Sequence, residues 1–302
     1  MKRVPFKVVD VFTPISFAGN PAGVVWEDRD LSAEEMQKIA KEVNLSETAF
    51  LVKPEGDANV GVRFFTPEQE LELAGHPTIA LFHVLAEEGK FFLREPVTVV
   101  TQETKAGVLP VELHVSQGKV KKIIMSQLKP SYAPFEESWQ DLAETLGADP
   151  HQIVATDLPV EIVSTGLSHL IVPIKNLEDL ESLRPDSERL AALNRNWGVD
   201  TTHVFTQQTK SPLSMVHTRD FGPAVGIRED PATGTANGAL GAYLIKNKII
   251  RGNSPLTIIS EQGYTMGRPS EITIEIHFED SLVNLVKVGG KAVTVLEGEI
   301  IL

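Results

Sequence analysis

The sequence predicts a protein of alternating strands and helices that is built from two related halves. Strand-like segments rich in β-branched and aromatic residues alternate with segments that carry apolar residues at helical spacing. Two short patterns also recur: RFFTP at 63–67 resembles RDFGP at 219–223, and GHPTIAL at 75–81 aligns with GTANGAL at 234–240. Both copies have the same succession of strand, loop, glycine and apolar helix. We therefore expect two halves of similar structure.

Length and composition are those of a globular protein. The chain has 302 residues, of which 42% are hydrophobic and 23% charged, which suffices for two modest domains. The net charge of -13 opposes binding to nucleic acid or to an anionic membrane surface. Pro5, Lys7 and Asp10 interrupt the N-terminus before a signal-peptide core develops, and no apolar run approaches the roughly 18 residues of a membrane span. We expect a soluble, cytoplasmic protein without nucleic-acid or membrane partners.

The chain contains no cysteine, which excludes several kinds of chemistry. Disulfides, zinc–thiolate sites, iron–sulfur clusters and thiol nucleophiles or bases are impossible. The eight histidines show no H-E-x-x-H or other metal-binding spacing, so we expect no metal site. A G-x-S-x-G motif is also missing, which disfavours a serine hydrolase.

The individual elements follow from periodicity and capping signals. The strongest is a helix over 31–43, where Ser32 is the predicted N-cap and Glu35, three residues later, completes a capping box. A second helix is predicted over 75–89, ended by Gly89. Two more helices are predicted over 137–147 and 187–198. The predicted strands cover residues 6–13, 46–52, 59–65, 96–102, 108–115, 120–127, 160–166 and 169–174, and most of the chain from 256 to 302.

The repeated glycines point to an anion-binding site. A glycine at a helix start lets a ligand approach the free backbone N–H groups, and the helix dipole favours negative charge there. Gly75 with His76, and Gly234 with Thr235, stand at the two predicted helix starts. Either glycine alone is better explained by tight helix–strand packing, but the pairing favours two helix starts that bind one carboxylate.

Three titratable residues stand close to these helix starts in the sequence. Asp230 precedes Pro231 and His76 precedes Pro77, and a residue before proline avoids helical geometry, so each is expected at the mouth of its helix. Taken singly, His76 is better explained as a partly buried histidine bonded to a backbone carbonyl, and Asp230 as an ordinary capping carboxylate. By spacing alone, Glu47 is no more than a surface glutamate at the start of a strand.

Four multi-residue blocks give the sequence a family resemblance. They are VDVFTPISFAGNPAGVV at 9–25, NLSETAF at 44–50, FFTPEQELELAGHPTIA at 64–80 and REDPATGTANGALGAYL at 228–244. In this order they resemble the PhzF-like phenazine-biosynthesis family, which shares its fold with diaminopimelate epimerase, and the resemblance covers essentially the whole chain.

The resemblance implies an α+β fold of two pseudo-symmetric domains, each a curved, mostly antiparallel sheet or barrel around a central helix. The implied domains are 1–128 and 129–290, with the last strand, 291–302, returning to the first. The two central helices begin near His76 and Thr235, and the active site lies in the cleft between the domains. Family members are commonly homodimers.

The resemblance also assigns roles to individual residues. Glu47 is implied to be the acid/base that transfers the proton, and His76 and Asp230 to bind substrate and assist the proton movement. Gly75, Gly234 and Thr235 are implied to hold the substrate carboxylate. Thr235 departs from the serine that is commoner in the family at this position, and Arg228 and Glu229 receive no role.

The implied function is a cofactor-independent isomerase that moves a proton on a small carboxylic acid. A C–H next to a carboxylate becomes labile when preorganised N–H donors meet the developing charge, and burial tunes the proton affinity of the carboxylate base. Epimerases of this architecture that use two thiols are excluded by the absence of cysteine. The alternative is a non-catalytic carboxylate-binding or regulatory protein on the same fold.

Overall fold

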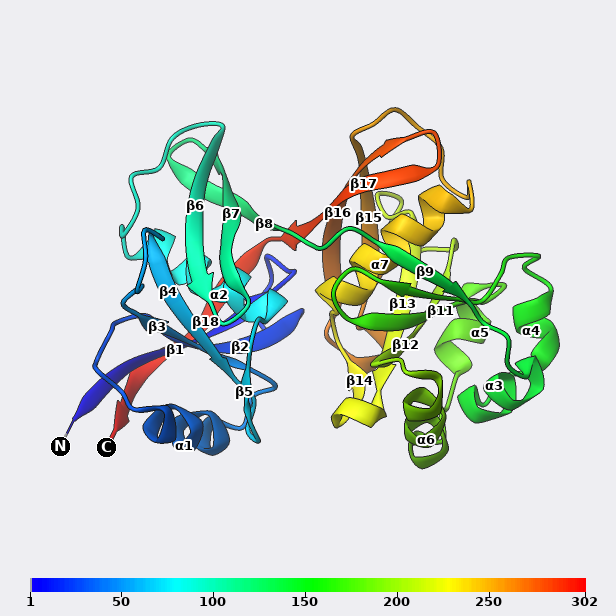
Figure 1. Ribbon diagram of the computed structural model, residues 1–302, viewed down its shortest axis with the longest axis horizontal. Coiled ribbons are helices and arrows are strands. Elements are labelled where there is room, and N and C mark those ends of the chain that lie inside the picture. Colours follow the sequence, from blue (N-terminus) through cyan, green and yellow to red (C-terminus); the bar gives the residue numbers. More distant parts are fainter. Residues whose placement is uncertain (1) are drawn as a thin grey trace. The chain divides into compact units, whose positions relative to one another are not determined.

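The computed structural model describes residues 2–302, apart from the side chain of Val154, and it forms two compact units (Figure 1). The first unit contains the chain up to Ser126 together with Gly289–Leu302, and the second contains Gln127–Val288. The chain therefore passes from one unit to the other twice.

The first unit surrounds the helix α2 with strands (Figure 1). Its elements are β1 (Arg3–Val11), β2 (Asn20–Val25), α1 (Ala33–Val43), β3 (Thr48–Val52), β4 (Val60–Phe65), β5 (Glu70–Leu71), α2 (Gly75–Glu87), β6 (Val97–Thr104), β7 (Gly107–Ser116), β8 (Lys119–Ser126) and β18 (Ala292–Ile301). Most neighbours are antiparallel, including β18 with β1, and the parallel pairs are β2 with β3 and β4 with β6. The helix α2 packs against β1, β2, β3, β8 and β18, and its residues from Pro77 to Phe82 are all buried. A helix that is apolar on all sides is stable only in such an enclosed position.

The second unit is built in the same way around α7. Its elements are β9 (Ser131–Pro134), α3 (Trp139–Leu146), α4 (Pro150–Val154), β10 (Glu161–Ser164), β11 (Ser168–Pro173), α5 (Leu177–Ser182), α6 (Ser187–Trp197), β12 (Thr201–Thr206), β13 (Val216–Gly222), the 3₁₀ turn η1 (Pro223–Val225), β14 (Ile227–Asp230), α7 (Gly234–Lys246), β15 (Leu256–Gln262), the 3₁₀ turn η2 (Tyr264–Met266), β16 (Ser270–Glu279) and β17 (Leu282–Gly290). Ten consecutive residues of α7, Ala236–Ile245, are buried. Gly241 makes this possible, because a Cβ there would lie 2.7 Å from Cγ2 of Ile274 on β16.

The strand pairings of the two units correspond one to one. In the second unit β9, β10, β11, β12, β13 and β15 pair in sequence, and the parallel pairs are β11 with β12 and β13 with β15. These are the equivalents of β18, β1, β2, β3, β4 and β6, and β5 and β14 are equivalent short strands that pair with β4 and β13. The recurrence of RFFTP as RDFGP and of GHPTIAL as GTANGAL thus has a structural basis: each pattern includes residues of the same pair of elements, β4 with β13 and α2 with α7. The α+β fold predicted from the sequence is confirmed.

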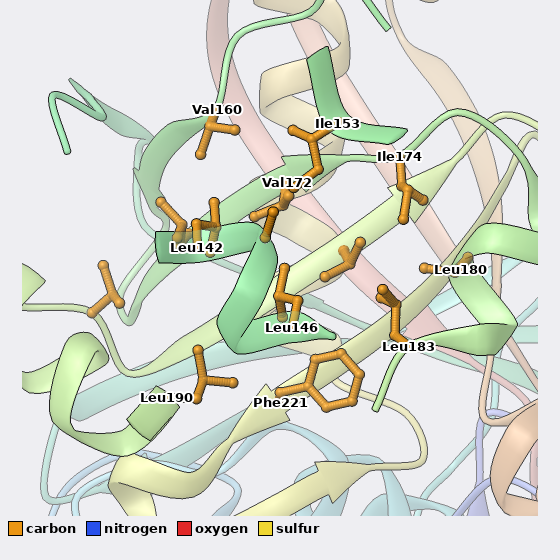
Figure 2. Close-up of a cluster of buried hydrophobic side chains, with 14 residues drawn as sticks. Leu142, Leu146, Ile153, Val160, Val172, Ile174, Leu180, Leu183, Leu190 and Phe221 are labelled. Atoms are coloured by element: carbon orange, nitrogen blue, oxygen red, sulfur yellow. The ribbon is translucent and has the colours of Figure 1, made fainter. Parts of the chain in front are cut away.

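Helices also cover the outer face of each sheet. In the first unit α1 packs its Met36, Ile39 and Ala40 against Phe50 and Phe65. In the second unit α3, α4, α5 and α6 cover one face of the sheet, and Figure 2 shows leucines of α3, α5 and α6 and Ile153 of α4 in one cluster with Val172, Ile174 and Phe221. The opposite face of these strands packs against α7 in the second unit and against α2 in the first. In each unit the strands are therefore enclosed between helices. No helix within residues 2–302 is long and apolar enough to cross a lipid bilayer.

The five helices expected from the sequence are present as α1, α2, α3, α6 and α7, and α1 has the predicted capping box. The Glu35 N–H donates to Ser32 Oγ (3.2 Å), and the Ser32 N–H donates to Glu35 Oε2 (2.7 Å). The short helices α4 and α5 and the strand β12 were not predicted. All six residues of β12, TTHVFT, are buried, so it shows neither alternation nor a continuous apolar run.

Candidate functional site

In the first unit, three of the predicted site residues come together at the N-terminus of α2. Glu47 directly precedes β3, while Gly75 and His76 are the first two residues of α2. The Nδ1 atom of His76 lies 3.5 Å from Oε2 of Glu47. The side chains of Glu47 and His76 are 19% and 10% exposed, so both are shielded while still accessible to a small molecule.

His76 is held in a neutral state. Burial lowers its pKa from 6.5 to about 4, although a hydrogen bond to the Pro21 backbone acts in the opposite direction. Proline has no N–H, so the ring donates to the Pro21 carbonyl. Ser46 Oγ lies 3.4 Å from Nε2 of the same ring. At neutral pH, His76 therefore lies beside Glu47 as an uncharged side chain and is not its counter-ion.

The first turn of α2 presents backbone donors next to these side chains. Its N-cap is Ala74, and no side chain of residues 2–302 makes a cap hydrogen bond there. A Cβ added at Gly75 would meet nothing within 4 Å, so this position borders open space. Positive charge for an anion at this place comes from the helix N-terminus, since His76 is neutral.

In the second unit, the other three predicted residues gather at the N-terminus of α7. Asp230 ends β14, and Gly234 and Thr235 begin α7. The hydroxyl of Thr233, the N-cap residue, donates to Oδ2 of Asp230 at 2.6 Å instead of capping the helix. As at α2, the first-turn N–H groups have no side-chain cap within residues 2–302.

Each helix start is preceded by an arginine–glutamate pair of the same geometry. Arg63 on β4 donates through Nε and Nη2 to Glu70 on β5 (2.7 and 2.9 Å), and Arg219 on β13 donates likewise to Glu229 on β14 (2.8 and 2.9 Å). Each guanidinium also lies over a phenylalanine ring two residues along its strand. Each glutamate stands five residues before the glycine that starts the helix. The pairs thus hold β5 and β14 against β4 and β13, and this gives Glu229 a structural role, whereas Arg228 is exposed.

Sequence reasoning did not single out several groups that contact the predicted site residues. Ser46 and the Pro21 carbonyl contact His76, and Thr233 contacts Asp230. Ser46 and Thr233 lie inside the quoted blocks NLSETAF and REDPATGTANGALGAYL, so their proximity in sequence was an available signal. The Pro21 carbonyl is a backbone group, and its role depends on the pairing of β2 beside β3.

Comparisons with known proteins show which family this fold and sequence belong to. The family model for phenazine biosynthesis-like protein matches residues 9–298. A protein of Clostridium acetobutylicum named an uncharacterized isomerase is 36% identical, over 97% of each chain. The trans-2,3-dihydro-3-hydroxyanthranilate isomerase of Pseudomonas aeruginosa is 30% identical, over 97% of this chain and 98% of its own.

A solved structure extends the similarity to three dimensions. The PhzF-family phenazine biosynthesis protein of Bacillus anthracis superimposes with a TM-score of 0.92 at 32% identity, with complete coverage of both chains. The two units, their repeated strand pairings and their two buried helices are thus accounted for by one family. The chain belongs to the PhzF-like phenazine-biosynthesis family, and it is an isomerase.

Proposed function

We propose that this isomerase moves a proton between two carbon atoms of a small carboxylic acid, with Glu47 as the acid/base and without a cofactor. The observation that supports this most directly is the grouping of Glu47 with a neutral His76 at the start of α2, which no side chain of residues 2–302 caps. A protein that only bound an anion would need neither the Glu47 carboxylate nor the His76 imidazole at this place.

In the proposed reaction, Glu47 as carboxylate removes a proton from a C–H bond of the substrate. The electron pair left behind is delocalised through the unsaturated acid toward its carboxylate oxygens. Backbone N–H groups at the starts of α2 and α7 hold these oxygens and stabilise the developing charge. Glu47, now protonated, returns the proton to a different carbon, so that atoms and charge balance without a redox partner.

We propose that Asp230 with Gly234 and Thr235 acts on the same substrate molecule as Glu47, Gly75 and His76, with the substrate bound in a cleft between the two units. His76 and Asp230 then orient the substrate through hydrogen bonds. Because neutral His76 donates its single N–H to the Pro21 carbonyl, its other ring nitrogen acts toward the substrate as an acceptor, and it keeps this state at any pH well above about 4.

The decisive variant is Glu47→Gln, which keeps the shape of the side chain and removes its ability to accept a proton. Trans-2,3-dihydro-3-hydroxyanthranilate, the substrate in the name of the Pseudomonas aeruginosa relative, is the first compound to test, followed by a panel of cyclic and unsaturated acids. Deuterium incorporation from heavy water reports proton transfer directly. The variant should lose activity by about a hundredfold or more, whereas Glu42→Gln, at an exposed position of α1, should retain it.

A non-catalytic binder would give a different result. In that case wild type and Glu47→Gln would bind the acids equally, and neither would incorporate deuterium. Activity that required an added cofactor or metal, or that was lost on chelation, would contradict the cofactor-independent part of the proposal.

We also propose that the protein is a homodimer, as the family resemblance implies, and that it is cytoplasmic, as its lack of cysteine suggests. The mass of the particle in solution should then be twice the 33.0 kDa of one chain. Sedimentation equilibrium at several concentrations would measure it, and a monomer at all concentrations would contradict the dimer.

A further inference from the structure

Gln262, the last residue of β15, binds the segment that leads from Asp230 into α7. Its side chain is completely buried. The amide Nε2 donates to the backbone carbonyl of Asp230 (2.8 Å) and to Thr233 Oγ1 (3.1 Å). The amide oxygen accepts the backbone N–H of Thr233 (3.2 Å) and Nδ2 of Asn237 (2.8 Å). One amide thus fixes both ends of the segment 230–233 and the first turn of the helix.

The backbone partners determine which way the Gln262 amide points. The Asp230 carbonyl can only accept and the Thr233 N–H can only donate, so the amide nitrogen must face the first and the oxygen the second. The Thr233 hydroxyl then accepts a hydrogen bond from Gln262 Nε2. Its own proton is directed to Oδ2 of Asp230, at 2.6 Å. The direction of donation runs from Gln262 through Thr233 to the carboxylate.

The first unit provides an internal comparison. There Gln102 on β6, the strand equivalent to β15, accepts a hydrogen bond from Thr78 in the first turn of α2 (3.3 Å). Attachment of the helix start to the neighbouring strand through a buried glutamine is therefore common to both units. When GHPTIAL is aligned with GTANGAL, however, the positions of Asp230 and Thr233 are occupied by Leu71 and Ala74. At these two positions the first unit thus has neither the carboxylate nor the hydroxyl.

A purely structural role does not explain this difference. Thr233 is the N-cap of α7, where a hydroxyl ordinarily stabilises the helix by accepting one of its first N–H groups. Here the hydroxyl is used for Asp230, and the helix is left without a side-chain cap within residues 2–302. The arrangement gives up the stability of a cap, orients a carboxylate and leaves backbone donors available for an anion.

We propose that Thr233 and Gln262 are positioning residues that orient the carboxylate of Asp230 toward the substrate. This inference rests on the proposed function, in which Asp230 contacts substrate. Neither residue exchanges a proton with the substrate. Their effect is to keep Asp230 in one rotamer with Oδ2 as a hydrogen-bond acceptor, so that no ordering of this side chain is needed when the substrate binds or reacts.

Two variants of Thr233 separate positioning from folding. Thr233→Val removes the hydroxyl at nearly constant shape, and Thr233→Ser restores it. A hydrogen bond to a charged group corresponds to about one to two powers of ten in rate. We expect kcat/KM for the isomerase reaction to fall about tenfold to a hundredfold in Thr233→Val and to remain within about threefold of wild type in Thr233→Ser. Gln262→Glu, which replaces the donating nitrogen by oxygen, should resemble Thr233→Val.

The double variant Asp230→Asn with Thr233→Val tests whether Thr233 acts through Asp230. It should be no slower than Asp230→Asn alone, because the hydroxyl has no carboxylate left to orient. Thr145→Val is the matched control: Thr145 is a buried threonine of α3 whose hydroxyl donates to the Asp141 carbonyl. Its urea midpoint should fall without a change in kcat/KM. The proposal is overturned if Thr233→Val and Thr233→Ser lose activity equally, or if the losses multiply in the double variant.

Failure of the proposed function would be recognised separately, by absence of deuterium incorporation in the wild type. The positioning role would then be decided by the ¹³C chemical shift of the Asp230 carboxyl at pH 7. A shift that changes in Thr233→Val and is restored in Thr233→Ser supports it. An identical shift in wild type and both variants overturns it.

Discussion

Glu229→Gln should destabilise the second unit considerably more than Glu70→Gln destabilises the first. The two pairs have the same bidentate geometry but differ in burial. The Arg219 side chain is 5% exposed, and its guanidinium is enclosed by Glu229, the Phe221 ring and the carbonyls of Leu180 and Leu183. The Arg63 side chain is 28% exposed.

The expected magnitude follows from what each arginine keeps after the change. Removing one partner of a buried ion pair costs about 3–5 kcal/mol, because the remaining charge is desolvated without compensation. Arg219 retains two carbonyl acceptors at 3.0 Å, so the lower end of that range, about 3 kcal/mol, applies to Glu229→Gln. Water screens Arg63 after the equivalent change in Glu70, so we expect about 1 kcal/mol there.

Urea unfolding monitored by tryptophan fluorescence distinguishes the two units. Of the three tryptophans, Trp139 and Trp197 lie in the second unit and Trp26 in the first. Glu229→Gln should shift the unfolding transition reported by Trp139 and Trp197 to lower urea concentration. Replacing these two tryptophans by phenylalanine leaves Trp26 as the reporter for the effect of Glu70→Gln on the first unit. Equal losses of unfolding free energy in the two variants, or a loss below about 1 kcal/mol for Glu229→Gln, would refute this reasoning.

Three further predictions concern the rest of the fold. Burial lowers the pKa of His169 from 6.5 to about 4, so its stabilising contribution is complete above pH 6.5 and is lost as the pH falls to about 4. The corresponding loss of unfolding free energy is about 3 kcal/mol. Urea unfolding measured between pH 7 and pH 4 should therefore show a smaller loss of unfolding free energy in His169→Gln than in the wild type. Ser32→Ala removes the capping box of α1 and should lower the unfolding free energy by about 1 kcal/mol, measured with urea, whereas no change would show that the cap is immaterial. Gly241→Ala should lower the thermal midpoint despite the better helix propensity of alanine, since its Cβ would lie 2.7 Å from Ile274; an unchanged or higher midpoint would contradict the packing argument.

Local signals in the sequence were sufficient for much of the fold. The capping box at Ser32 and Glu35 depends on residues three apart, and the glycines that begin α2 and α7 are recognisable because the pattern occurs twice. Interactions between strands were not predictable in this way. Arg63 and Glu70 are seven residues apart but Arg219 and Glu229 are ten apart, since η1 lengthens the second connection, so no fixed spacing marks the two pairs.

The buried polar side chains of the second unit illustrate the same limit. Strand β12 contains His203, which is buried against Asp220 on β13 with 2.9 Å between Nδ1 and Oδ1. A histidine and an aspartate read in isolation indicate exposed positions, and only the pairing of the strands reveals that each compensates the other. Gln262 is a similar case, because Asp230, Thr233 and Asn237, to which its side chain makes hydrogen bonds, lie 25 to 32 residues away.

The site residues named from the sequence divide by the kind of evidence that supports them. The positions of Gly75, His76, Gly234 and Thr235 at helix starts follow from local rules about glycine and proline. Glu47 had no such local signal, and the family resemblance alone singled it out. The structure places its carboxylate 3.5 Å from the His76 ring.

The central claim is that Glu47 transfers a proton on a carboxylic acid, and deuterium incorporation measured by mass spectrometry tests it most directly. Wild type and Glu47→Gln are compared in heavy water with trans-2,3-dihydro-3-hydroxyanthranilate and with the panel of unsaturated acids. We predict incorporation of deuterium at carbon by the wild type and a loss of about a hundredfold or more in the variant. Equal incorporation by the two proteins would contradict the role of Glu47, and binding without incorporation in either would contradict proton transfer altogether.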